Sequence, residues 1–364
     1  MKKRIISIFF VVLMAAAMTA CGSKEGSSSG KSNSSGEENS TKTGDKSSSA
    51  AEEKSITIAY CTEILDENET GYANAVQYGI DQYNARDDAK FHIEDLVKYD
   101  ANGDVDTQNS QLEDCVATGV DLVILTCVDD VGNKTGAQYC IDNGVKVIDV
   151  RGGLYGTADV VCCPCAFANE AAEMRQWWEG YMSENPNTKL NIGVVFATPE
   201  STSSFVRVDW VYDFADKYDT VNVIAKDYGE WATDPTQKIV EDWIQTYPDM
   251  NLIVCANDEE ALGAVNALQA ADRLDDVMVT GINGGTSGTS MLQNDQLTVT
   301  VGQLKDQAGL AYLEVALKLL QGEKVDFDKT GTVENYDKDY EFLRVITPDT
   351  ADDWIKYKSQ FPWW

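Results

Sequence analysis

Short segments rich in β-branched residues alternate with longer segments of helical periodicity from Ser55 onward. In a first series, strands are predicted at 56–60, 91–97, 122–126 and 145–150, with helices at 72–85, 105–118 and 134–143 between them. A second series has strands at 190–196, 221–226, 252–255 and 277–280, separated by helices near 203–217, 235–247, 258–271 and 286–294. This alternation predicts parallel sheets with helices on both faces, and the two series predict two similar α/β lobes.

The alternation also predicts where a binding site should lie. In open parallel sheets, ligands bind at the carboxyl ends of the strands. The loops that follow the predicted strands are 61–71, 149–157, 197–207, 227–234, 256–258 and 281–286. We therefore look for binding residues in these loops.

The first 54 residues have the features of an export signal followed by a tether. Basic residues 2–4 precede an apolar run over 5–17 that is too short to span a bilayer comfortably. The next four residues, Met-Thr-Ala-Cys, resemble a bacterial lipobox with Met18 where Leu is usual. We expect 1–20 to be a lipoprotein signal peptide, Cys21 to be lipidated, and the Ser- and Gly-rich segment 21–54 to be a disordered tether. The alternative is an ordinary signal peptide that is cut nearby.

The composition excludes one class of partner. The chain has 60 Asp and Glu against 29 Lys and Arg, which gives a formal net charge of −31. A surface with this charge repels phosphate backbones, so we expect no binding to nucleic acid. The length of 364 residues exceeds what one compact core usually holds, which agrees with two lobes.

A series of motifs lies between residues 228 and 324. They are Gly229-Glu230-Trp231, Tyr247-Pro248-Asp249, Ala256-Asn257-Asp258-Glu259-Glu260-Ala261-Leu262-Gly263-Ala264, Gly281-Ile282-Asn283-Gly284 and Gly302-Gln303-Leu304. In this order and spacing the chain resembles the ribose- and galactose-binding branch of the type I periplasmic binding proteins, which feed ABC transporters. That family shares its core with lac-repressor-type regulators. No helix-turn-helix pattern precedes Ser55 and an export signal does, so a regulator is not favoured.

The resemblance implies a particular architecture. It predicts two doubly wound parallel-sheet lobes joined by a three-segment hinge, with crossings near 165–169, near 300–303 and after about residue 335. Lobe one would comprise 55–166 plus 303–334, and lobe two would comprise 167–302 plus 335–364. We expect the protein to be a monomer without a cofactor.

The resemblance also implies binding residues. A sugar presents apolar C–H faces and a ring of hydroxyl groups, so its site needs aromatic plates and planar polar groups. The resemblance implies that Trp231 is an aromatic residue that stacks on the ligand and that the side-chain amide of Asn257 binds its hydroxyl groups. It also implies that Gln303 is a hinge glutamine that contacts the ligand. Asn283 stands where the family has Asp, and Ile282 replaces its Phe. Structural alternatives exist: Asn257 as a helix cap, Trp231 packed under its loop, and Gln303 as hinge support.

The remaining matches are looser. Tyr72 aligns with one of two adjacent family aromatics, and Ala73 takes the other place. Arg207 is the nearest match to a ligand-binding arginine, one residue out of register, with a solvated helix charge as the alternative. Asp149 and Arg151 lie on either side of the positions where the family has an adjacent Asp-Arg pair, and they do not reproduce that pair. The expected ligand is a monosaccharide. These departures from the family pattern leave a modified sugar, a polyol or another small polar molecule as alternatives.

The sequence gives little support for catalysis or for a metal. His92, the one histidine, falls in a predicted strand as an outward-facing residue, without a nucleophile motif. The glycines at 284, 285 and 288 do not match a phosphate-binding loop. The Cys162, Cys163 and Cys165 cluster lacks the spacing of a zinc site, and we expect the cysteines after Cys21 to be mostly free thiols.

Together these features predict a lipid-anchored, extracytoplasmic protein that is not an enzyme. It would bind a monosaccharide between its lobes and deliver it to an ABC transporter permease. One rival is a sensory protein of the same fold that signals to a histidine kinase or chemoreceptor. Another is a secreted hydrolase, which an assay for turnover would reveal.

Overall fold

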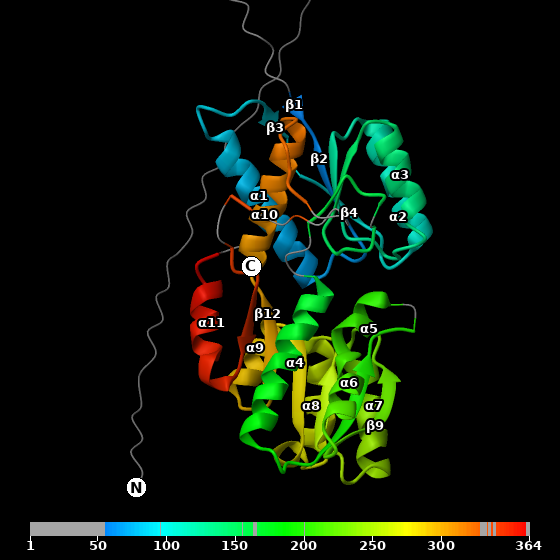
Figure 1. The fold of residues 1–364 in the computed structure, drawn as a ribbon, viewed down its shortest axis with the longest axis vertical. Helices are drawn as coiled ribbons and strands as arrows, with labels where there is room; N and C mark the ends of the chain where they lie inside the picture. Colours follow the sequence, from blue (N-terminus) through cyan, green and yellow to red (C-terminus); the bar gives the residue numbers. More distant parts are fainter. Residues whose placement is uncertain are drawn as a thin grey trace, which may run out of the picture. The chain divides into compact units, whose positions relative to one another are not determined.

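The computed structural model describes residues 55–94, 96–154, 156–162, 166–199, 201–327, 333, 336–337 and 340–361. The expected signal peptide at 1–20, Cys21, the tether up to residue 54, and Cys163 and Cys165 lie outside the described residues. The described part is an α/β structure with two main sheets (Figure 1).

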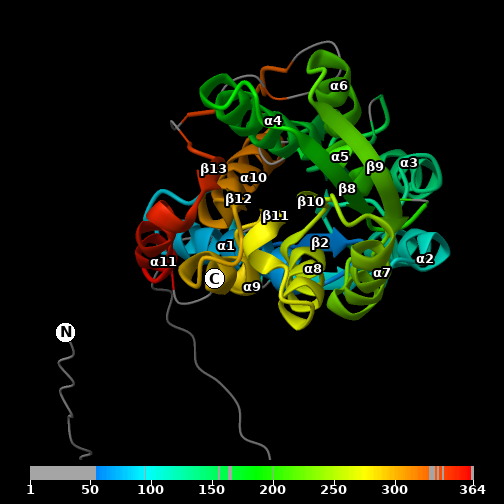
Figure 2. The same cartoon turned by 90° about the horizontal axis from the view of Figure 1, so that it is seen from below.

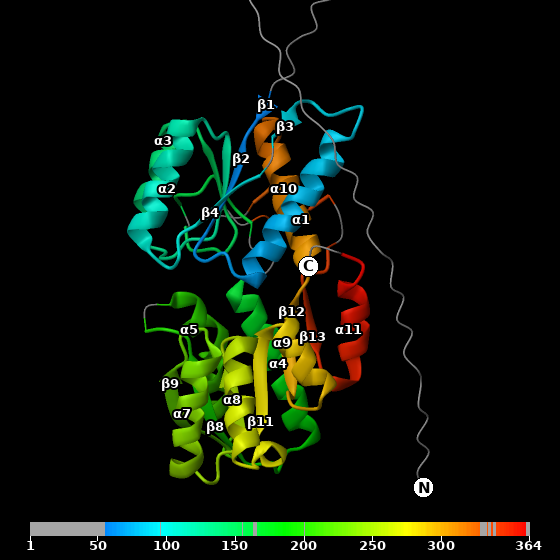
Figure 3. The ribbon, with the colours of Figure 1, turned by 180° about the vertical axis from the view of Figure 1, so that it is seen from behind.

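The first lobe is built on a five-stranded parallel sheet. Its strand order is β4 (Val97–Asp100), β2 (Ile58–Thr62), β5 (Leu122–Leu125), β6 (Lys146–Asp149) and β7 (Val160–Val161). The short strands β1 (Ser55–Ile56) and β3 (His92–Ile93) pair separately. One face is covered by α1 (Glu67–Asn84) and α10 (Lys305–Leu320), which lie side by side (Figure 3), and the other by α2 (Val105–Thr118) and α3 (Lys134–Asp142).

Alternation along the strands explains why both faces are covered. Tyr60 and Ile124 belong to the cluster under α1 and α10, whereas Cys61 and Leu125 belong to the cluster under α2 and α3. Neighbouring strand residues point to opposite faces, so a strand that is apolar throughout must be buried on both sides.

The second lobe is built on a six-stranded sheet. Its strand order is β13 (Leu343–Ile346), β12 (Val299–Gln303), β11 (Met278–Asn283), β10 (Leu252–Cys255), β8 (Leu190–Phe196) and β9 (Val221–Tyr228). All neighbours are parallel except β13, which runs antiparallel to β12.

Helices cover both faces of this sheet as well (Figure 2). On one face lie α4 (Phe167–Glu184), α5 (Thr202–Val208) and α6 (Trp210–Lys217). On the other lie α7 (Thr233–Thr246), α8 (Asp258–Ala270), α9 (Thr286–Gln293) and α11 (Ala351–Lys358). Two short 3-10 turns, η1 (Leu274–Asp276) and η2 (Pro348–Thr350), precede β11 and α11.

The chain passes between the lobes three times. It leaves the first sheet after β7 and enters α4, it returns from β12 into α10, and it leaves again between Val333 and β13. This arrangement confirms the expected fold class of two doubly wound lobes with a three-segment hinge. The residue-level lobe boundaries expected from the sequence stay a prediction.

Several elements differ from the sequence-based prediction. The predicted helix near 203–217 is two helices, α5 and α6, which meet at Asp209. The predicted strand at 91–97 is two short strands, and α4 was not predicted at all. Helix α4 buries Met174, Trp178 and Met182, which are spaced four residues apart, so it does carry a helical stripe.

Candidate functional site

A cavity of about 480 Å³ lies where loops at the carboxyl ends of strands from both lobes come together. Five of the eight predicted ligand residues line it: Arg151, Arg207, Trp231, Asn257 and Asn283. Arg151 follows β6, Trp231 follows β9, Asn257 follows β10 and Asn283 ends β11. These positions agree with the general rule that the carboxyl ends of parallel strands form the site.

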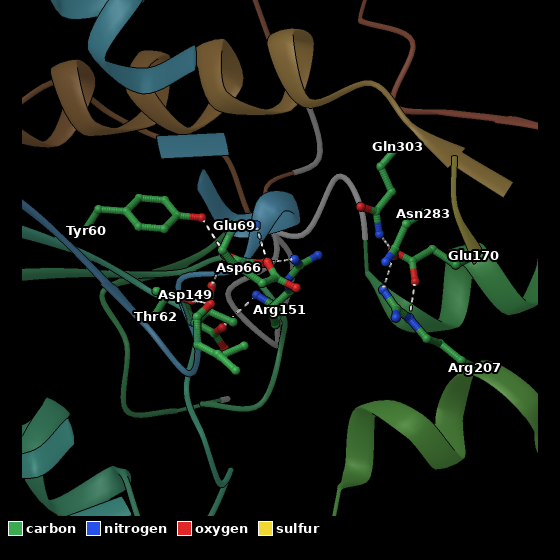
Figure 4. Close-up of polar contacts among 12 residues, drawn as sticks. Tyr60, Thr62, Asp66, Glu69, Asp149, Arg151, Glu170, Arg207, Asn283 and Gln303 are labelled. Carbon is green, nitrogen blue, oxygen red and sulfur yellow. Dashed lines mark hydrogen bonds and ion pairs between the residues drawn. The ribbon is translucent and has the colours of Figure 1, made fainter. Parts of the chain in front are cut away.

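Arg207 of α5 is held by three contacts, of which those with Glu170 and Asn283 can be followed in Figure 4. Its Nε donates to Oε2 of Glu170 at 2.7 Å, its Nη1 to the carbonyl oxygen of Ala256 at 3.2 Å, and its Nη2 to Oδ1 of Asn283 at 3.2 Å. Both Arg207 and Glu170 are buried. The ion pair therefore balances the guanidinium charge and fixes its plane toward the cavity.

Arg151 of the first lobe is fixed in a similar way (Figure 4). Its Nη2 forms a buried ion pair with Oε1 of Glu69, whose Oε2 accepts a hydrogen bond from Tyr60 at 2.7 Å. Burial alone would raise the pKa of Glu69, but the Arg151 guanidinium and the Tyr60 hydroxyl hold it below its ordinary value. Glu69 is therefore charged at neutral pH.

Phe167, the first residue of α4, lies between the two arginines. The Cζ atom of Arg151 is 5.0 Å from its ring centroid and the Cζ atom of Arg207 is 5.1 Å away. Arg207 also lies over the ring of Trp231, at 5.4 Å. The cavity thus combines two aromatic rings with two guanidinium groups, one from each lobe.

Asn257 caps a helix and lines the cavity at once. Its Oδ1 accepts from the N–H of Glu260 at 2.8 Å, and its Nδ2 donates to the carbonyl oxygen of Trp231 at 3.2 Å. The carboxyl group of Glu260 in turn accepts from the N–H groups of Trp231 and Ala256. Burial raises the pKa of Glu260 to about 8, although these N–H groups oppose the shift.

This network holds Trp231 in an unusual backbone conformation. Trp231 has φ 59° and the preceding Glu230 has φ 57°. Such angles are uncommon for residues other than glycine and need support from the surroundings. The hydrogen bonds that the N–H of Trp231 donates to Glu260 and that its carbonyl oxygen accepts from Asn257 provide that support and present the half-buried indole to the cavity.

Three predicted ligand residues do not line the cavity. Gln303 is fully buried, and its Nε2 donates to Oε1 of Glu170 at 2.5 Å. Tyr72 lies behind Arg151, with the guanidinium 5.1 Å from its ring centroid. Asp149 is buried and accepts from the N–H groups of Arg151, Gly152 and Leu154, so it shapes the loop that carries Arg151. Their roles in ligand binding stay predictions.

The loop between β2 and α1 lies within the segment 61–71 in which binding residues were expected, but none of its residues was predicted individually. Helix α1 begins at Glu67, five residues before the predicted start, and this places Asn68 and Glu69 at the cavity instead of Tyr72. Glu63 lies in the same loop, and burial with the nearby charge of Glu69 raises its pKa to about 7. Glu67 also accepts a hydrogen bond of 2.8 Å from the hydroxyl of Thr286 in the second lobe.

Other expectations concern cysteine, histidine and metal. Cys61, Cys115, Cys127, Cys140, Cys162 and Cys255 are buried free thiols, in line with the expectation for these six. His92 is exposed in β3, as expected. Within the described residues, no group of three or more His, Cys, Asp or Glu side chains is arranged to hold a metal ion. None of the helices in the described part is long and apolar enough to cross a membrane.

The fold and the cavity define a two-lobed solute-binding protein. The family model for the periplasmic binding protein domain matches residues 64–324, and the chain belongs to this family. The chain is also 30% identical over 258 residues to the xylitol-binding protein of Mycolicibacterium smegmatis, covering 69% of each chain. It is 22% identical to the ribose import binding protein of Bacillus subtilis, covering 63% of this chain and 73% of the relative.

Solved structures agree on the fold. A solute-binding protein of an ABC transporter from Bacillus halodurans, with bound myo-inositol, matches with a TM-score of 0.66 at 20% identity and covers 84% of this chain and 98% of its own. A periplasmic solute-binding protein from Actinobacillus succinogenes, with bound D-allose, matches with a TM-score of 0.65 at 20% identity and covers 82% and 99%. The family is one of extracytoplasmic binding proteins, which agrees with the expectation that the chain is not an enzyme.

Proposed function

We propose that this protein is a lipid-anchored receptor that captures a monosaccharide or a related polyol in the cavity and delivers it to an ABC transporter permease. The observation that carries the proposal is the pairing of aromatic rings with planar hydrogen-bonding groups around one cavity. Phe167 and Trp231 offer apolar faces, while Arg151, Arg207 and Asn283 offer planar polar groups. This combination suits a ring with C–H faces and an equatorial girdle of hydroxyl groups.

The charges of the two arginines support an uncharged ligand. Each guanidinium is already paired with a buried carboxylate, Arg151 with Glu69 and Arg207 with Glu170. A paired arginine still donates hydrogen bonds through its remaining N–H groups, but it offers little net charge to an anion. Hydroxyl groups are therefore better partners for this site than a carboxylate or a phosphate.

The names of the relatives point the same way. The similar proteins include a xylitol-binding protein and ribose import binding proteins, and the similar structures carry bound myo-inositol and D-allose. All four ligands are small and rich in hydroxyl groups. We propose that the ligand of the present chain belongs to this class of small molecules, without assigning one particular member.

The anchoring part of the proposal rests on the sequence alone. The basic residues, the apolar run and Cys21 form a lipoprotein signal, and a serine-rich tether follows. Cys21→Ala should move the protein from the membrane fraction to the soluble fraction of cells that express it. An alanine variant that stays as membrane-bound as the wild type would contradict the lipid anchor.

The binding part can be tested by thermal unfolding in the presence of candidate ligands. The Cys21→Ala chain from residue 21 onward should be screened against neutral monosaccharides and polyols, including D-ribose, D-allose, xylitol and myo-inositol. A ligand at a hundred times its Kd should add about 2.7 kcal/mol to the free energy of unfolding. If no sugar or polyol raises the melting temperature, the proposed ligand class is wrong.

A further inference from the structure

Lys305 is the first residue of α10, immediately after the second crossing between the lobes, and its side chain lines the cavity. The residue is only 1% exposed. Its aliphatic stem lies across Gly71 of α1, where an added Cβ would come within 2.5 Å of the lysine Cδ. Gly309 of α10 likewise packs directly against α1, near Ala75. The stem is therefore held between two tightly packed helices.

The ammonium group of Lys305 differs from the other cations of the cavity. Arg151 and Arg207 each pair with a buried carboxylate, whereas no residue in the described part of the chain forms a hydrogen bond or an ion pair with the ammonium group of Lys305. Burial and the charge of Lys358 lower the pKa of Lys305 to about 8, while Glu67 and Asp66 act in the opposite direction. A buried ammonium without hydrogen bonds is costly, so the side chain is suited to a partner that enters the cavity.

We infer that Lys305 is a ligand-contacting residue that donates hydrogen bonds to hydroxyl oxygens of an uncharged sugar or polyol and sets the charge selectivity of the site. The inference rests on the proposed function and extends it to a residue and a selectivity. An ammonium group has donors and no acceptor, so its partner must offer oxygen lone pairs.

The surrounding charges decide between neutral and charged ligands. Seven carboxylate residues and three cationic residues line the cavity among the described residues, and both arginines are already neutralised. A ligand carboxylate or phosphate that reached Lys305 would lie near Asp66 and Glu67, which would repel it. A ligand ammonium could not accept a hydrogen bond from Lys305 and would be repelled by its charge. These charges therefore favour an uncharged ligand that presents an oxygen to Lys305.

The test is calorimetry on the Cys21→Ala chain with neutral probes (D-ribose, D-allose, xylitol and myo-inositol) and charged probes (D-glucuronate and D-glucosamine). We expect a neutral probe to bind most tightly and Lys305→Met to raise its Kd by about tenfold or more. Lys318→Met, the same change at the far end of α10 and away from the cavity, should leave Kd unchanged. Ligand-free Lys305→Met should melt at or above the wild-type temperature, because the change removes a buried unpaired charge.

A second variant moves the lysine without removing it. Gly71→Ala would push the Cδ of Lys305 and should also weaken binding, whereas Gly180→Ala in α4, where an added Cβ meets no atom within 4 Å, should not. Unchanged affinity in both Lys305→Met and Gly71→Ala would overturn the contact. Tighter binding of D-glucuronate or D-glucosamine than of every neutral probe would overturn the selectivity. Binding of no probe to the wild type would refute the proposed function, and this inference with it.

Discussion

Arg207 donates from Nη2 to Oδ1 of Asn283 at 3.2 Å, which links α5 to the end of β11 at the wall of the cavity. The arginine was one residue out of register in the family comparison, and Asn283 replaces the family's Asp. The shifted arginine and the substituted asparagine therefore contact each other. The amide oxygen of Asn283 accepts from the guanidinium without adding a second negative charge beside Glu170. The Nδ2 of Asn283 remains available as a donor to a ligand.

Asn283→Asp should therefore change the preferred ligand more than it changes the fold. The carboxylate would still accept from Arg207, but it would lose the donor that the amide provides. Calorimetry with the neutral panel should give a different order of affinities, while the melting temperature of the ligand-free chain stays close to that of the wild type. Asn294→Asp, the same change at an exposed position after α9, is the control. An unchanged order of affinities would remove Asn283 from the site.

Trp231→Ala should weaken binding by about 2 kcal/mol or more, because buried aromatic rings dominate contacts of this kind. The change removes the ring over Arg207 and leaves the backbone at 231 under the same constraint, since alanine gains no freedom at positive φ. Trp177→Ala removes a partly exposed indole on the outer face of α4 and should not alter the affinity. Wild-type affinity in Trp231→Ala would contradict the stacking role.

The second-lobe wall of the cavity could be predicted because two kinds of signal coincide there. The predicted strands indicate the loops 227–234, 256–258 and 281–286, and the family resemblance identifies Trp231, Asn257 and Asn283 within them. The alternative of Asn257 as a helix cap is confirmed as well, because the residue both caps α8 and lines the cavity. One side chain can satisfy both demands because its oxygen and nitrogen have separate partners.

The first-lobe wall could not be predicted in the same way. Glu69 and Arg151 are 82 residues apart, and no local pattern records that they pair. Helix α1 begins at Glu67, five residues before its predicted start, and Glu69 in its first turn lines the cavity, whereas Tyr72, which the family resemblance implied, does not. Phe167 and Lys305 were missed because they stand at crossings between the lobes, where neither strand nor helix periodicity identifies a residue that faces the cavity.

Arg207→Met should destabilise the ligand-free protein by about 3–5 kcal/mol, because it leaves the buried carboxylate of Glu170 without its cation. Denaturation in urea measures this loss. The double variant Arg207→Met/Glu170→Gln should recover part of it. Arg175→Met breaks a partly exposed pair with Glu179 and should cost less than about 1 kcal/mol. Equal losses in the two single variants would mean that the buried pair has no special weight.

The stability of the folded chain should fall as the pH rises through the neutral range. Glu260 has a folded pKa of about 8, well above the ordinary glutamate value of about 4.3, so in this window the folded chain holds a proton that the unfolded chain releases. Glu63 and Asp258, each with a pKa raised to about 7, act in the same direction. Lys305, whose pKa is lowered to about 8, acts in the opposite direction and only above that pH.

Glu260→Gln should therefore give a shallower decline of the free energy of unfolding between about pH 5 and pH 8, as measured by urea denaturation at a series of pH values. Glu241→Gln, the same change at an exposed position on α7, should keep the wild-type slope. A wild-type slope in Glu260→Gln would show that this carboxyl group is ionised throughout the window, held so by the N–H groups of Trp231 and Ala256.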